Sequence, residues 1–179
     1  MRTRYKTIGS GDEVYFVTFT IVNHIPVFTH KRYFDIIINN FEWYKEKNGL
    51  KICYYVIMDN HVHLILQSIN NLSDDIRDLK KMIAKQCLDK LKLDNRGWIL
   101  GLMKTFKKDY KIKSTYQFWE EGSHPQLIQT IDMLNQKADY IHKNPVKRGF
   151  VLKEDDWLYS SAKNINKLES CFEIDEINV

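Results

Sequence analysis

The sequence predicts an α+β fold, a ferredoxin-like split βαβ sandwich in which helices cover one face of an antiparallel sheet. Three observations predict it. The expected elements follow in the order strand, helix, strand, strand, helix, strand, helix. Runs rich in β-branched and aromatic residues alternate with segments whose apolar residues recur at helical spacing. The two middle strands are separated by only two residues, which indicates a hairpin.

The first half of the chain carries the clearest signals. Residues 14–22 are β-branched and aromatic and favour a strand, and residues 31–47 carry apolar side chains at helical spacing. Gly49 follows that helix as a typical C-terminal cap. Residues 50–58 and 61–67 then form the two strands of the hairpin around an Asp-Asn turn.

The second half is predicted with less regular signals. Ser73, with two aspartates behind it, is expected to cap a helix whose apolar face is Ile76, Leu79, Ile83 and Cys87. Residues 95–113 are expected to be partly helical, and residues 115–119 and 126–130 to form short strands. A last helix, 131–143, has the apolar face Ile131, Leu134, Ala138 and Ile141 and is expected to stop before Pro145.

Composition favours one domain over residues 1–179, with a core at about 12–165 and a C-terminal tail at 166–179. Of the 179 residues, 44% are hydrophobic and 28% are charged, which suits a globular protein with a buried core. The three scattered cysteines indicate reduced thiols. A polar, basic start and the lack of a long apolar stretch favour a cytoplasmic location without a membrane partner.

Two histidines stand two apart in the second strand of the hairpin. Because side chains alternate across a strand, His61 and His63 are expected on one face, with Val62 and Leu64 on the buried face. Two neighbouring imidazoles can bind one divalent cation. The alternative is that one histidine caps the hairpin and the other is a partly exposed strand residue.

The last helix carries a second candidate pair. Tyr140 and Asn144 are four residues apart and therefore share a face, which Gln136 and Lys137 extend. A tyrosine can act as a nucleophile that forms a covalent intermediate, and an amide oxygen can bind a metal. The alternative is that Tyr140 packs in the core and Asn144 ends the helix before a proline.

Basic residues mark one helix face. Arg77, Lys81 and Lys85 recur four apart, and Lys80 joins them. Such a stripe either contacts nucleic-acid phosphates or is a solvated surface. The net charge of +4 is compatible with nucleic acid without requiring it.

These motifs coincide with those of a known family. Met58-Asp-Asn-His-Val-His-Leu64 resembles the M-P-N-H-V-H-L segment of the REP-associated tyrosine transposases and related single-tyrosine HUH insertion-sequence transposases. Tyr140-Ile-His-Lys-Asn-Pro-Val146 resembles their second signature segment. Weaker matches extend the resemblance over residues 12–165. Asp59 departs from the family pattern, which has proline there, and either completes the turn or lies beside the metal site.

The resemblance implies an RRM-like HUH endonuclease core that cleaves and rejoins single-stranded DNA near hairpins through a 5′-phosphotyrosine. Tyr140 would be the nucleophile, and His61, His63 and Asn144 would bind Mg²⁺ or Mn²⁺. The DNA-binding residues would be Arg77, Lys80, Lys81, Lys85 and Lys137, and Lys137 would also help Tyr140 to lose its proton. The family leaves a homodimer or a monomer open. The alternative function is a domesticated protein that binds hairpin DNA without cleaving it.

Overall fold

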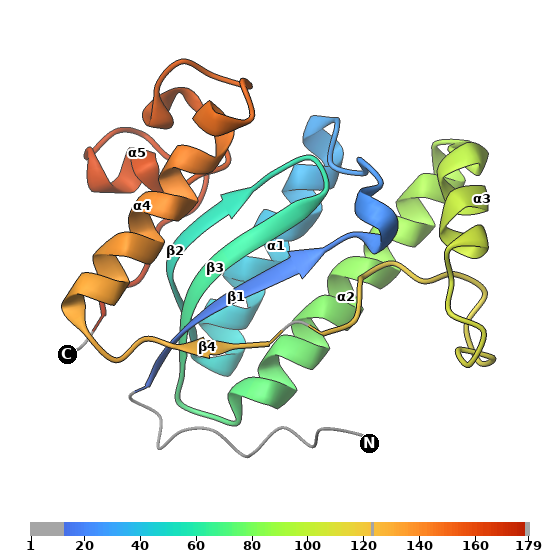
Figure 1. The fold of residues 1–179 in the computed structure, drawn as a ribbon, viewed down its shortest axis with the longest axis horizontal. Coiled ribbons are helices and arrows are strands. Elements are labelled where there is room, and N and C mark those ends of the chain that lie inside the picture. The colour runs from blue at the N-terminus through green and yellow to red at the C-terminus, as the bar shows by residue number, and fades with distance from the viewer. Residues whose placement is uncertain (1–12, 123, 178–179) are drawn as a thin grey trace.

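The computed structural model describes residues 13–122 and 124–177, and it confirms the predicted α+β fold (Figure 1). Four strands form one sheet in the order β2-β3-β1-β4, and every pairing in it is antiparallel. The strands are β1 Val14–Thr20, β2 Leu50–Ile57, β3 His61–Ser68 and β4 Gln126–Leu127. The helices are α1 Lys31–Asn48, α2 Leu72–Leu93, α3 Gly97–Thr105, α4 Ile131–Lys147 and α5 Ala162–Ile165.

Helices α1 and α2 cover one face of the sheet, behind the strands in Figure 1. The larger hydrophobic core lies between these two layers. Alternate residues of the two central strands point into it, namely Tyr15, Val17 and Phe19 from β1 and Val62, Leu64 and Leu66 from β3. The opposite face of the same strands is therefore left to the residues between them, including both candidate histidines.

Helix α4 packs against that opposite face through β2 and β3, and it lies beside β2 at the left of Figure 1. A β-bulge at Cys53 makes this possible, because it shifts the strand alternation so that Val56 and Met58 point toward α4. A second, smaller cluster results, made of Cys53, Val56, Met58, Ile65, Ala138 and Ile141. Near β1, α4 contacts this face through Lys137 and Tyr140, which both approach the Phe16 ring.

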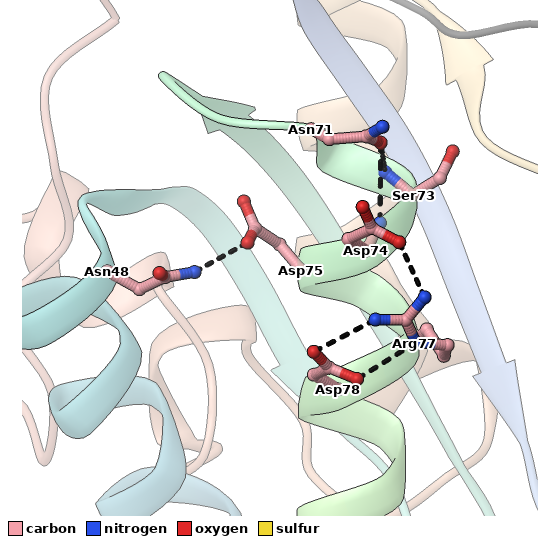
Figure 2. A network of polar contacts seen from close by, with 7 residues as sticks. All are labelled: Asn48, Asn71, Ser73, Asp74, Asp75, Arg77 and Asp78. Atoms are coloured by element: carbon pink, nitrogen blue, oxygen red, sulfur yellow. Dashed lines mark hydrogen bonds and ion pairs between the residues drawn. The ribbon is translucent and has the colours of Figure 1, made fainter.

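Two predicted helix ends were wrong. Helix α4 does not stop before Pro145 but continues to Lys147, with Pro145 buried inside it. A proline three residues from a helix end removes a single backbone hydrogen bond, and the Arg148 N–H still donates to the Asn144 carbonyl at 3.0 Å. Helix α2 is capped by Asn71 rather than Ser73, since the Asn71 side chain accepts from the N–H of Ser73 (Figure 2).

The chain after α4 returns along the free edge of β2. The Ile57 N–H donates to the Tyr159 carbonyl at 2.9 Å, and the Asp175 N–H donates to the Ile52 carbonyl at 2.9 Å. Phe172 is buried in the larger core, so the predicted tail contributes to it. Within the described ranges, none of the helices has the length and apolar character needed to cross a bilayer.

Candidate active site

His61 and His63 lie side by side at the start of β3, on the face opposite α1 and α2, as the strand periodicity predicted. Their ring centroids are 4.7 Å apart at an interplanar angle of 71°. His63 is buried, whereas His61 is half-buried. The two imidazoles are therefore close enough to serve one ligand.

Helix α4 brings Tyr140 to these rings from a segment more than seventy residues later in the chain. The Tyr140 ring centroid lies 5.0 Å from that of His63 and 6.1 Å from that of Phe16. Its side chain is 41% exposed, so it contacts the histidine and still faces solvent. A phenol in this position can be reached by a substrate that binds on this face of the sheet.

Asn144 follows Tyr140 by one helical turn and reaches the other histidine. It is buried, and its side chain hydrogen bonds to that of His61. The structure therefore brings together all four residues that the two motifs singled out. The interpretations of Tyr140 as a core residue and of Asn144 as a simple helix stop do not describe this arrangement.

Neighbouring side chains hold the Nδ1 atom of each imidazole. His63 Nδ1 is 2.8 Å from Thr18 Oγ1, and His61 Nδ1 is 2.6 Å from Asn60 Oδ1. Because an amide oxygen only accepts, His61 Nδ1 carries the proton and its Nε2 keeps a lone pair. Asn60 is itself fixed, since its amide donates to the His24 carbonyl at 3.0 Å.

Burial keeps both rings neutral. It lowers the pKa of His63 to about 3, with smaller contributions from the nearby His61 and Lys137. It also lowers the pKa of His61, against an opposing effect of the Asp59 carboxylate. Neutral imidazole is the form that binds metals, so both histidines are in the protonation state that a metal ligand needs.

The site fits a divalent cation on its own geometry. His63 Nε2 is buried and has no hydrogen-bond partner among the described residues, which is unusual for a polar atom unless a ligand satisfies it. Residues 13–122 and 124–177 contain no cluster of three or more histidine, cysteine or acidic side chains able to hold a metal. The third donor here would be the amide oxygen of Asn144.

Two lysines of α4 lie close to the site. Lys137 places its ammonium 4.7 Å from the Phe16 ring centroid, and Lys147 places its own 5.6 Å from the Tyr140 ring centroid. Lys137 was predicted near the site, whereas Lys147 was not. A helix continuing past Pro145 was needed to bring Lys147 one turn above Asn144.

The predicted DNA-binding residues of α2 lie in the layer on the far side of the sheet from the candidate active site (Figure 1). Arg77 pairs with Asp74 and Asp78 on its own helix, at 2.5 and 2.9 Å (Figure 2). Lys80 turns inward, with its ammonium 5.2 Å from the Phe19 ring centroid. Lys81 and Lys85 are exposed. Arg77, Lys80 and Lys81 line one hollow, whereas Lys85 is not part of its lining.

Sequence reasoning missed the residues that orient the histidines. Thr18 lies directly opposite His63 in the pairing of β1 with β3, so the strand register would have identified it. Asn60 stands beside His61 in the hairpin turn and was interpreted only as a turn residue. Asp59 also belongs to that turn, and its carboxylate is 3.5 Å from the guanidinium of Arg148.

Comparison with known proteins supports the resemblance. No family model matches the chain. A "putative REP-associated tyrosine transposase" of Haemophilus influenzae is 30% identical over 118 residues, which cover 63% of this chain and 59% of the relative. The match thus spans less than two thirds of the relative's length.

A solved structure shares the fold. It is that of a REP-associated tyrosine transposase bound to a REP hairpin, with a TM-score of 0.66 and 19% identity, covering 100% of this chain and 94% of the other. The similarity predicted from the His-x-His and Tyr-x-x-x-Asn motifs is therefore confirmed, and this chain is a homologue of a protein described as a REP-associated tyrosine transposase.

Proposed function

We propose that this chain is a metal-dependent tyrosine transposase that cleaves and rejoins single-stranded DNA beside hairpins. The observation that supports this function is the contact of an accessible Tyr140 with His63, in a site where both imidazoles are neutral. A tyrosine used only for packing would not need two neutral histidines and a buried amide around it.

His61, His63 and Asn144 would hold Mg²⁺ or Mn²⁺. The unpartnered Nε2 of His63 and the fixed tautomer of His61 support this assignment. Imidazole ligands favour Mn²⁺ over Mg²⁺ among these two ions. When bound, the cation would draw charge from a non-bridging oxygen of the scissile phosphate.

Tyr140 would then attack the phosphorus in line with the bond to O3′. The new bond joins the phenolic oxygen to the phosphorus, the P–O3′ bond breaks, and the leaving oxygen becomes a free 3′-OH after taking up a proton. The product is a 5′-phosphotyrosine. The ammonium groups of Lys137 and Lys147 lie where the attacking phenolate would meet positive charge.

Rejoining reverses these bonds. A different 3′-OH attacks the phosphotyrosine, gives its proton to the departing phenolate and restores Tyr140. Because the phosphodiester bond energy is kept in the phosphotyrosine, the chain needs no nucleotide cofactor for this reaction.

DNA would contact two separate surfaces. Lys137 lies beside the candidate active site, whereas the exposed Lys81 and Lys85 lie on α2 and would meet phosphates farther along the DNA. Lys80 and Arg77 would contribute only after changing their present contacts. The homologue bound to a REP hairpin makes a hairpin the first DNA to test.

The test uses single-stranded DNA from the flanks of the chain's own gene, containing a hairpin and labelled at either end. The protein and its Tyr140→Phe variant are incubated with Mn²⁺ or with EDTA and separated under denaturing conditions. Tyr110→Phe is the matched control, because Tyr110 is 66% exposed and its hydroxyl hydrogen bonds to Glu121 rather than contacting the histidines.

A covalent adduct is expected only with Mn²⁺ and an intact Tyr140, and it should carry the 3′-end label and not the 5′-end label. Tight hairpin binding without an adduct under any condition would instead establish a DNA-binding protein that does not cleave.

A further inference from the structure

A small polar pocket lies beside the candidate active site, at the outer edge of β1. Its volume is about 260 Å³, which is room for one planar base and not for a duplex. We call it the β1 pocket, and the residues used below are Phe16, Thr18, Thr20, Glu120, His124 and Gln126. None of the roles assigned so far uses the pocket itself.

The pocket exists because β4 is so short. Only Gln126 and Leu127 pair with β1, and the chain before them bends away from the sheet at Gly122, whose φ is +84°. The chain before the bend returns to β1 at the other end of the strand, where the Glu120 N–H donates to the Thr20 carbonyl at 2.7 Å. The space between these two attachments is the pocket.

Two side chains join the pocket to the candidate active site. The Phe16 ring stacks on His63 with centroids 5.6 Å apart and also contacts Tyr140. Thr18 lines the pocket and hydrogen bonds to His63. A group in the pocket therefore lies one side chain away from the phosphate that Tyr140 would attack.

We propose that the β1 pocket binds one unpaired nucleobase next to the scissile phosphate, and that it selects a base with an exocyclic amino group. This inference rests on the proposed function for the position of the phosphate. It adds to that function a direct contact between protein and base that favours adenine, cytosine or guanine over thymine at one position of the cleavage site.

The charges around the pocket favour a base inside it and keep the DNA phosphates outside it. Carboxylates at the pocket repel phosphate and accept hydrogen bonds from amino groups, as acidic residues do from cytosine N4. Glu120 is held in place because its Oε1 accepts from the Asn23 N–H at 2.7 Å. Lys137, whose ammonium lies 4.7 Å from the Phe16 ring centroid and which does not line the pocket, offers the positive charge that suits the phosphate.

The remaining lining suits a planar base. Phe16 is half-buried and lines the pocket, so a base can contact its aromatic ring, a contribution that does not depend on sequence. Gln126 is exposed and carries both a donor and an acceptor, and His124 closes the pocket over Gly122. Stacking holds any base, whereas Glu120 and Gln126 read its edge.

The experiment measures binding and cleavage of hairpin DNAs that differ in one base on either side of the cut. Binding is measured in EDTA with the Tyr140→Phe variant, so that it does not depend on chemistry. At one position, hairpin DNA with thymine should bind about tenfold more weakly than the same DNA with adenine, cytosine or guanine. Glu120→Gln should reduce this difference to less than about twofold, because a glutamine can also donate to thymine O4.

Glu42→Gln on α1 is the matched control, since it removes an exposed carboxylate on the opposite layer and should leave the base preference unchanged. Gln126→Leu is a second variant with little risk to folding, and it should weaken binding of the preferred bases several-fold.

Equal binding of all four bases by the parent protein, an unchanged preference in Glu120→Gln, or no DNA binding at all would overturn the proposal. A different outcome is a base preference that depends on Glu120 in a protein that never forms a covalent adduct. That result would support base binding in the β1 pocket and contradict the proposed function.

Discussion

Each histidine of the candidate active site is oriented by one neighbouring polar side chain. Thr18 contacts Nδ1 of His63 and Asn60 contacts Nδ1 of His61, so the Nε2 atoms are the ones that would bind a metal, and that of His63 has no partner among the described residues. Outer contacts of this kind fix the ring tautomer and orientation of metal-binding histidines and are worth 10–100-fold in metal affinity.

Asn60→Ala is therefore expected to weaken Mn²⁺ binding by roughly 10–100-fold, because His61 loses the acceptor that fixes its tautomer. Mn²⁺ binding is measured by electron paramagnetic resonance in the Tyr140→Phe background. Asn39→Ala, on the exposed side of α1, should bind Mn²⁺ as the parent does. Equal affinity of the Asn60 variant and the parent would show that this hydrogen bond does not position the ring.

At the scale of elements, a buried histidine adds a polar attachment to the apolar packing of α4 against β2. His142 Nε2 is 2.9 Å from Ser161 Oγ, and that hydroxyl also donates to the Tyr55 carbonyl at 3.2 Å. His142 is buried, and these contacts give it a structural role. The two residues flanking it at i−2 and i+2 are Tyr140 and Asn144, so this attachment sets the height of both above the sheet.

His142→Ala should lower the free energy of unfolding by about 2–3 kcal/mol, through a cavity and a lost buried hydrogen bond. Urea denaturation measures the change. Lys143→Ala provides the comparison, since its ammonium is exposed and pairs with Asp139 on the same helix, and its effect should stay within about 0.5 kcal/mol. Similar stabilities of the two variants would contradict a role for His142 in attaching α4.

Helix α2 presents a titratable group of a different kind. Burial lowers the pKa of Lys80 to about 8, helped by the nearby Lys111 and opposed by Glu121. The amine should titrate near pH 8 in nuclear magnetic resonance of the ¹³C-methylated protein, in a signal missing from Lys80→Arg. A phosphate close by favours the protonated form, so hairpin DNA should raise this midpoint if α2 contacts it. An unmoved midpoint would remove Lys80 from the DNA-binding surface.

At the scale of the whole molecule, the last described residues belong to the fold. Phe172 is buried between the rings of Phe41 and Tyr55, with centroids 5.7 Å from each. Asp175 makes backbone and side-chain hydrogen bonds to Ile52 at the edge of β2. The segment therefore covers a strand edge that would otherwise be open to pairing.

Phe172→Ala should lower the free energy of unfolding by about 3–5 kcal/mol, the usual range for a large aromatic side chain removed from a core. Thermal and urea denaturation measure this loss. Leu168→Ala is a comparison in the same segment, because Leu168 is 48% exposed. A Phe172 variant as stable as the parent would mean that the larger core closes without this segment.

Local periodicity predicted most of the fold and the four central site residues. The alternation in 61–67 and the four-residue spacing of Tyr140 and Asn144 are properties of a strand and a helix by themselves. The sequence could not show that α4 crosses to the second face, because that depends on the bulge at Cys53. Nor could it identify Thr18, whose contact with His63 depends on strand register.

The two-residue turn between β2 and β3 restricts how the length of this chain can change. Asn60 belongs to the turn and also fixes His61. Because side chains alternate along a strand, a shift of β3 by one residue would place an apolar neighbour where His63 now lies. Insertions and deletions should therefore be absent from this hairpin in working relatives. They should gather instead in the segment between α3 and Gln117, which lies far from the histidines and is mostly exposed.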